Sequence, residues 1–99
     1  MSSIPQVDVT ELRAVYDSRL SFYGKAQVIA GNGVIELQSH FDRVARLEDD
    51  ELTILPGANI WWSATTGRHI NDFVQQLDGK KMTKAQIIEA SNTGKNLLA

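Results

Sequence analysis

The sequence predicts an α+β domain in which an antiparallel meander of three to five strands is followed by a helix packed on the sheet. Strand-like runs fill residues 22–55 and are separated by turn residues, whereas helical patterns lie outside that range. Segregated strands and helices favour this arrangement over a parallel α/β fold. An N-terminal helix and a short C-terminal helix complete the predicted architecture.

The strongest helical signal lies in the stretch Trp61–Leu77. Ser63 is a good N-cap, because its hydroxyl can accept a hydrogen bond from the first turn. The residues that recur at helical spacing on one face are Thr66, Ile70, Phe73, Val74 and Leu77. Gly79 is expected to end the helix in the left-handed conformation. His69 then lies on the flank of the apolar face, and Arg68 points to solvent or to a partner.

The other two helices are predicted from capping patterns. Asp8 and Glu11 have the spacing of a capping box, so we expect a first helix that ends by residues 17–18. Thr83 and Gln86 predict a second box, which begins a brief helix over Lys84–Ala90. Residues 1–6 and 91–99 are expected to be flexible ends of a single domain covering 1–99.

Turn residues and alternation define the strands. Gly31-Asn32-Gly33 predicts a type I′ hairpin turn. The following strand, residues 34–41, is expected to place Ile35, Leu37 and Phe41 on one face, and Glu36, Gln38 and His40 on a solvated face. The acidic run Glu48–Glu51 is expected to form a soluble hairpin tip, since four adjacent carboxylates cannot lie in a core without partners.

Composition excludes several classes of protein. The 99-residue chain has a net charge of −2, which disfavours a general nucleic-acid binder. It has no cysteine and only two histidines, which are far apart in the sequence, so we expect no metal site and no cofactor. No apolar run reaches the roughly 20 residues of a membrane span. Residues 1–6 lack the pattern of a signal peptide, which predicts a cytoplasmic protein.

Three segments resemble a family of small uncharacterised proteins from bacteriophages and their hosts. They are Ser21–Ala26, Leu37-Gln38-Ser39 followed by Val44-Ala45, and Trp62–Thr66 followed by Arg68-His69-Ile70 and Phe73. Lys84–Ile88 fits the same pattern. The chain departs from it at His40-Phe41, at Glu48–Glu51 and at Trp61-Trp62. The resemblance implies a phage or prophage setting, and with it the bacterial cytoplasm, but no established activity.

We therefore predict a non-enzymatic accessory protein that binds and modulates, by inhibition, a host protein such as a defence or nucleic-acid enzyme. The expected contact residues are Trp61, Arg68 and His69, with an acidic second patch at Glu48, Asp49 and Asp50. Each has a structural alternative: Arg68 can pair with Asp72, His69 can bond a strand carbonyl, and Trp61 can pack beneath another segment. A homodimer is a further alternative.

The rival prediction is a small nucleic-acid or nucleotide-binding domain. Aromatic and basic side chains on a sheet can stack bases and contact phosphates. The residues that would do so are Tyr23, Lys25, Arg68, Lys80, Lys81 and Lys84. An enzyme is the least favoured class, because no nucleophile or carboxylate is placed beside a histidine by sequence.

Overall fold

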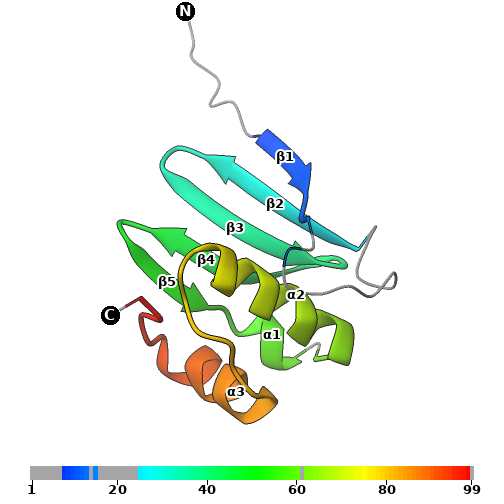
Figure 1. Cartoon of the computed structure of the whole chain (residues 1–99), viewed down its shortest axis with the longest axis vertical. Helices are drawn as coiled ribbons and strands as arrows, with labels where there is room; N and C mark the ends of the chain where they lie inside the picture. Colours follow the sequence, from blue (N-terminus) through cyan, green and yellow to red (C-terminus); the bar gives the residue numbers. More distant parts are fainter. Residues whose placement is uncertain (1–7, 14, 16–24, 61, 99) are drawn as a thin grey trace, which may run out of the picture.

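The computed structural model describes residues 8–13, 15, 25–60 and 62–98 and confirms an α+β fold. Five antiparallel strands form one sheet in the order β1-β2-β3-β4-β5. Their bounds are β1 Asp8–Glu11, β2 Ala26–Gly31, β3 Val34–Ser39, β4 Asp42–Glu48 and β5 Glu51–Ile54. The helices that follow are α1 Gly57–Ile60, α2 Ala64–Gln76 and α3 Lys84–Thr93. Figure 1 shows the meander running into these helices.

The predicted N-terminal helix is wrong, because the described chain begins with strand β1. Val9 pairs with Ile29 and Thr10 pairs with Val28 across the β1–β2 ladder. Val9 and Thr10 are β-branched and suit a strand. Their pairing with β2 outweighs the local capping signal, since tertiary context routinely overrides helix propensity. Residue 14 and the remainder of the expected helix, from residue 16 onward, lie outside the described residues.

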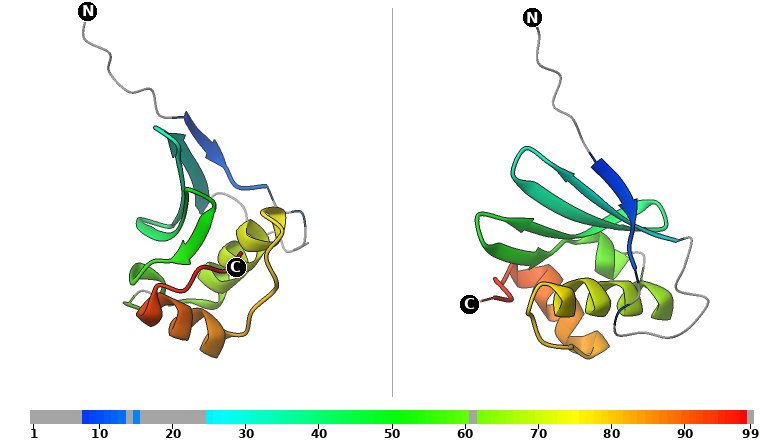
Figure 2. Two further views of the ribbon diagram at one scale, coloured as in Figure 1. Left: turned by 90° about the vertical axis from the view of Figure 1, so that its left-hand side faces the viewer. Right: turned by 45° about the horizontal axis from the view of Figure 1, so that its top comes forward.

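The core lies between one face of the sheet and the helices. Figure 2 shows the helices on one side of the sheet. Helix α2 packs on β3, and α3 packs on β5 and α1. The buried apolar residues on the strands are Ala26, Leu37, Val44, Ala45, Leu52 and Ile54. Those on the helices are Ala58, Ile70, Phe73, Val74, Ile87 and Ala90. The predicted apolar face of α2 is thereby confirmed.

A β-bulge shapes the middle of the sheet. The pairing between β3 and β4 shifts after Leu37, so that Leu37 opposes Ala45 whereas Gln38 opposes Arg43. Val44 is the extra residue on β4, and both Val44 and Ala45 are buried. A bulge of this kind bends its strand and increases the local twist.

The opposite face of the sheet carries an exposed charge cluster. Glu36 accepts hydrogen bonds from Arg43 Nη1 at 2.6 Å and from Arg46 Nε and Nη2 at 3.0 and 2.9 Å. The polar face predicted for this strand is therefore confirmed for Glu36. Since both arginine side chains are 44% exposed, the cluster contributes little to stability.

The C-terminal part of the chain is packed against the sheet edge. Helix α3 has the predicted Thr83–Gln86 capping box, but it continues to Thr93 rather than ending at Ala90. Beyond it, Leu97 N–H donates to the Leu52 carbonyl at 2.8 Å, and Leu52 N–H donates to Asn96 Oδ1 at 3.0 Å. Residues expected to be flexible therefore satisfy backbone groups of the edge strand β5.

Candidate functional site

The turn between β3 and β4 presents an exposed aromatic ring. Phe41 is 94% exposed, so its prediction as a core residue beside Ile35 and Leu37 is wrong. Strand β3 ends at Ser39, and the alternation that would have turned Phe41 inward ends with it. A fully exposed phenylalanine is a feature of contact surfaces, where large aromatic residues are the usual anchors.

The same turn has an unusual backbone. His40 has a φ of 57°, whereas the other described non-glycine residues with positive φ are Asn or Asp. Histidine is less costly than most residues in this region, but the conformation still has to be held by its surroundings. His40 N–H donates to the Lys25 carbonyl at 2.6 Å, which ties the turn to the start of β2.

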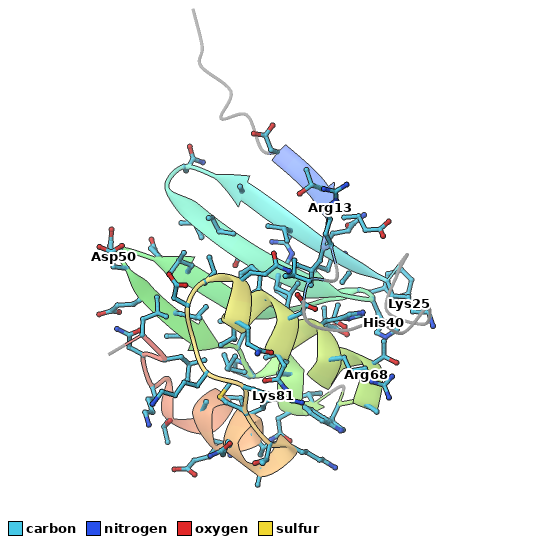
Figure 3. The ribbon with its side chains drawn as sticks, in the orientation of Figure 1. Arg13, Lys25, His40, Asp50, Arg68 and Lys81 are labelled. Carbon is cyan, nitrogen blue, oxygen red and sulfur yellow. The ribbon has the colours of Figure 1, made fainter. Side chains whose placement is uncertain are left out.

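Two basic residues also lie at this end of the molecule. Figure 3 shows Lys25, His40 and Arg68 together at one end. Lys25 is exposed, and Arg68, in the first half of α2, is half-buried. We name Lys25, His40, Phe41 and Arg68 the turn end. Its combination of one exposed ring with surrounding positive charge suits an acidic or anionic partner.

A buried polar network lies beneath the turn end. Ser39 Oγ lies 2.8 Å from His69 Nδ1 and 3.0 Å from Thr66 Oγ1. Thr66 Oγ1 lies 3.0 Å from Oγ of Ser63, which caps α2 as predicted by accepting from Thr66 N–H. These contacts connect strand β3 to the first two turns of α2.

His69 is therefore not at a surface. Its exposed fraction is 0%, and its Nδ1 contacts the hydroxyl of Ser39 on strand β3. His69 faces inward because it follows the buried Thr66 by three positions, which places both on one side of the helix. In this structure it cannot contact a partner directly.

Ser39 and His69 have the residue types of a nucleophile and its base, yet their placement does not fit catalysis. Ser39 is 2% exposed, so no substrate can reach its hydroxyl in this conformation. Sequence reasoning missed this pair because 30 positions separate the two residues. The alternation of β3, which places Ser39 on the same face as Leu37, is the signal that could have revealed it.

Asp72 is a second buried polar group on α2. It accepts hydrogen bonds from Val15 N–H at 3.1 and 3.2 Å and from Gln76 Nε2 at 2.6 Å. With 1% exposure, it joins α2 to the segment that follows β1. A carboxylate bonded in this way has a structural role, since a buried charge requires several donors.

Of the two adjacent tryptophans, the structure describes Trp62. Trp61 lies outside the described residues. Trp62 is half-buried and packs against the core. A Cβ added to Gly67 would lie 2.7 Å from Cη2 of this ring, so glycine allows their close approach. Lys84 Nζ lies 5.5 Å from the centroid of the same ring, a cation–π contact.

The residues predicted for nucleic-acid binding are only partly brought together. Lys25 and Arg68 share the turn end, whereas Tyr23 lies outside the described residues. Lys80 and Lys81 are exposed in the loop between α2 and α3, and Figure 3 shows Lys81 apart from Lys25. The ammonium group of Lys84 lies over the ring of Trp62.

The acidic run forms the β4–β5 hairpin tip, as predicted. Asp49 and Asp50 have φ values of 53° and 61°, and all four residues of Glu48–Glu51 are exposed. Figure 3 shows Asp50 at the opposite end of the molecule from Lys25 and His40. Strand β4, which joins the two ends, has 7 residues and is therefore about 20 Å long. We name Glu48–Glu51 the acidic tip.

A groove of about 660 Å³ opens near the C-terminal end of α2. Leu77, Met82, Leu97 and Leu98 supply its apolar wall. Asp78, Glu89, Lys80 and Lys95 supply balanced charges around it. Its volume is within the range of about 300–1,000 Å³ typical of ligand pockets. We name this feature the C-terminal groove.

The described residues contain no group of three or more histidines and carboxylates placed to hold a metal ion. Within the same part of the chain, each helix is too short or too polar to cross a membrane.

The chain belongs to the family of unknown function DUF8033, whose model matches residues 10–89. No curated protein and no solved structure matches the chain.

Proposed function

We propose that this chain is a non-enzymatic accessory protein of phage type that binds and inhibits a host protein through its turn end. Host defence or nucleic-acid enzymes are the partner classes we favour. The observation that carries the proposal is the 94% exposure of Phe41 on a turn whose neighbours are cationic. The partner surface it fits is an apolar pocket with an acidic rim.

The energetics of Phe41 support an anchor role. Burying an exposed phenylalanine side chain in a partner stabilises the complex by about 1.5–3 kcal/mol. The turn is held by the hydrogen bond from His40 N–H to the Lys25 carbonyl, so little conformational freedom is lost on binding. Lys25 adds positive charge that accelerates encounter with an acidic surface. The contact set predicted from sequence is thereby revised, with Phe41 and His40 joining Arg68 and with His69 removed.

Differential capture tests this proposal. The wild-type chain, Phe41→Ala and the control Val9→Ala are immobilised separately and exposed to lysate of the bacterial host. Val9 is an apolar residue on β1 that is also exposed, at 54%. We expect one stoichiometric protein to be retained by the wild type and by Val9→Ala, and its affinity for Phe41→Ala to fall about 10- to 100-fold. Equal retention by Phe41→Ala would overturn the proposal.

Nucleic-acid binding is a second candidate, favoured by the meeting of Lys25, Phe41 and Arg68 at one end. An exposed ring can stack a base, and nearby cations can contact phosphates. Affinity for a fluorescent single-stranded oligonucleotide, measured over a range of salt concentrations, separates the two candidates. Three phosphate contacts give a slope of about −2 in log affinity against log salt. That slope, together with loss of binding in Lys25→Glu, would favour this candidate over a protein partner.

A further inference from the structure

An exposed ring and an open groove lie at opposite ends of the same helix. The N-terminal half of α2 contacts the strand that leads into the turn end, through Ser39 and His69. The C-terminal end of α2 opens onto the C-terminal groove through Leu77 and Asp78. Helix α2 has 13 residues, so the two features are separated by about 18 Å along its axis. Phe41 of one molecule therefore cannot enter the groove of the same molecule.

The charges at the two ends are complementary. The turn end carries the basic residues Lys25 and Arg68, and the acidic tip, Glu48–Glu51, lies at the other end. The acidic tip follows directly on the part of β5 that lies beside the C-terminal groove: Leu97, which lines the groove, donates its N–H to the carbonyl of Leu52, the neighbour of Glu51. A ring that enters this groove would thus bring its surrounding cations close to the carboxylates of the tip.

We infer that the C-terminal groove accepts Phe41 of a second copy of this chain, in a head-to-tail contact. Two copies can pair about a two-fold axis, in which case each ring enters the groove of the other copy, or they can join through a single contact that leaves a free ring at one end and a free groove at the other. The first arrangement closes as a dimer, and the second extends into a ring or a chain of molecules. Each arrangement uses the surface proposed for the host partner, so binding of that partner and self-association exclude one another.

The contact is expected to be weak. One phenylalanine ring buries about 150–250 Å² of its own surface, and the polar rim adds little affinity. Total burial below about 1,200 Å² is typical of transient contacts. Self-association therefore belongs in the range of about 10 µM to about 1 mM.

Sedimentation velocity of the full-length chain tests the inference without any host component. The weight-average mass of the wild type is expected to rise through this concentration range, to the dimer value for a closed pair and past it for an extended assembly. Phe41→Ala removes the ring, and Leu98→Glu places a charge on the apolar wall of the groove. Both residues are exposed, so both variants are expected to fold, which circular dichroism confirms. Each variant alone is expected to associate at least about tenfold more weakly, whereas the control Val9→Ala matches the wild type.

Mixing the two variants provides the decisive measurement. Phe41→Ala retains an intact groove and Leu98→Glu retains an intact ring, so an equimolar mixture should form a one-to-one heterodimer that cannot extend. Two results would each overturn the inference: a wild type that stays monomeric throughout, or a mixture that does not dimerise. Neither of these results depends on capture of a host protein, so sedimentation and capture test the inference and the proposed function independently.

Discussion

Two adjacent residues at the C-terminal end of α2 are expected to respond to substitution in opposite ways. Asp78 adopts the left-handed conformation with a φ of 68°, whereas Gly79 does not. Gly79 N–H donates to the Val74 carbonyl at 2.8 Å, and Asp78 N–H donates to the Gln75 carbonyl at 3.1 Å. This is the Schellman pattern of helix termination. A Cβ on Gly79 would collide with Cγ1 of Val74 and lie 3.0 Å from its carbonyl oxygen.

The expected changes in the free energy of unfolding follow from the surroundings of Asp78 and Gly79. Val74 is 0% exposed and cannot move outward, so Gly79→Ala overpacks the core at a cost of about 1–3 kcal/mol. The reduced freedom of the unfolded chain offsets about 0.4–1 kcal/mol of this. The net loss in the free energy of unfolding is about 1–2 kcal/mol. Asp78→Gly removes the strain of a non-glycine residue in the left-handed conformation, which is about 1–2 kcal/mol. Glycine also makes the unfolded chain more flexible, which lowers the free energy of unfolding by about 0.5–1 kcal/mol. The net result is a small gain in stability.

Urea denaturation followed by circular dichroism measures both effects. With a slope of about 1–2 kcal/mol per molar urea, the midpoint for Gly79→Ala should fall by about 1 M, and that for Asp78→Gly should rise slightly. The reasoning would be refuted if Gly79→Ala left the midpoint unchanged, or if Asp78→Gly lowered it more than Gly79→Ala does.

The remaining predictions concern the buried network, the sheet surface and the α3 cap. Ser39→Ala should lower the free energy of unfolding by about 1–3 kcal/mol, because Nδ1 of buried His69 loses its partner; an unchanged urea midpoint would contradict this. Ser39 should resist labelling by a serine-directed phosphonate in the folded protein, as judged by mass spectrometry, since it is 2% exposed. Arg46→Ala should cost under about 1 kcal/mol, and the loss should shrink as salt screens its exposed pair with Glu36. Thr83→Ala should lower stability by about 1 kcal/mol in the same assay, whereas Thr83→Ser should not.

Local chemistry made much of the fold predictable. Asn32 and Gly33 have the positive φ values that their turn requires, and the acidic tip is a hairpin turn. Ser63 and Thr83 cap their helices as expected. In each case a few adjacent residues determine the geometry, so the pattern is readable from the sequence alone.

The errors arose where distant residues decide the conformation. Asp8–Glu11 carries a helix-capping pattern, but pairing with β2 converts it to a strand. Phe41 continues an apolar alternation that the turn interrupts. The link from Ser39 to His69 joins residues 30 positions apart. The alternation of β3 indicates that Ser39 faces inward, but no local pattern identifies its partner, because that depends on how strands and helices meet in space.

The buried polar network gives the turn end a physical basis for acting as a binding surface. Ser39 is the last residue of β3, directly before the turn, and its hydroxyl is held by His69 and Thr66 on α2. The ring of His40 lies 6.1 Å from that of His69, so the turn rests on the interior network. A polar network with its members bonded specifies one arrangement more strictly than apolar packing does. The positive φ of His40 is therefore held before any partner arrives, which reduces the entropy lost when Phe41 is buried.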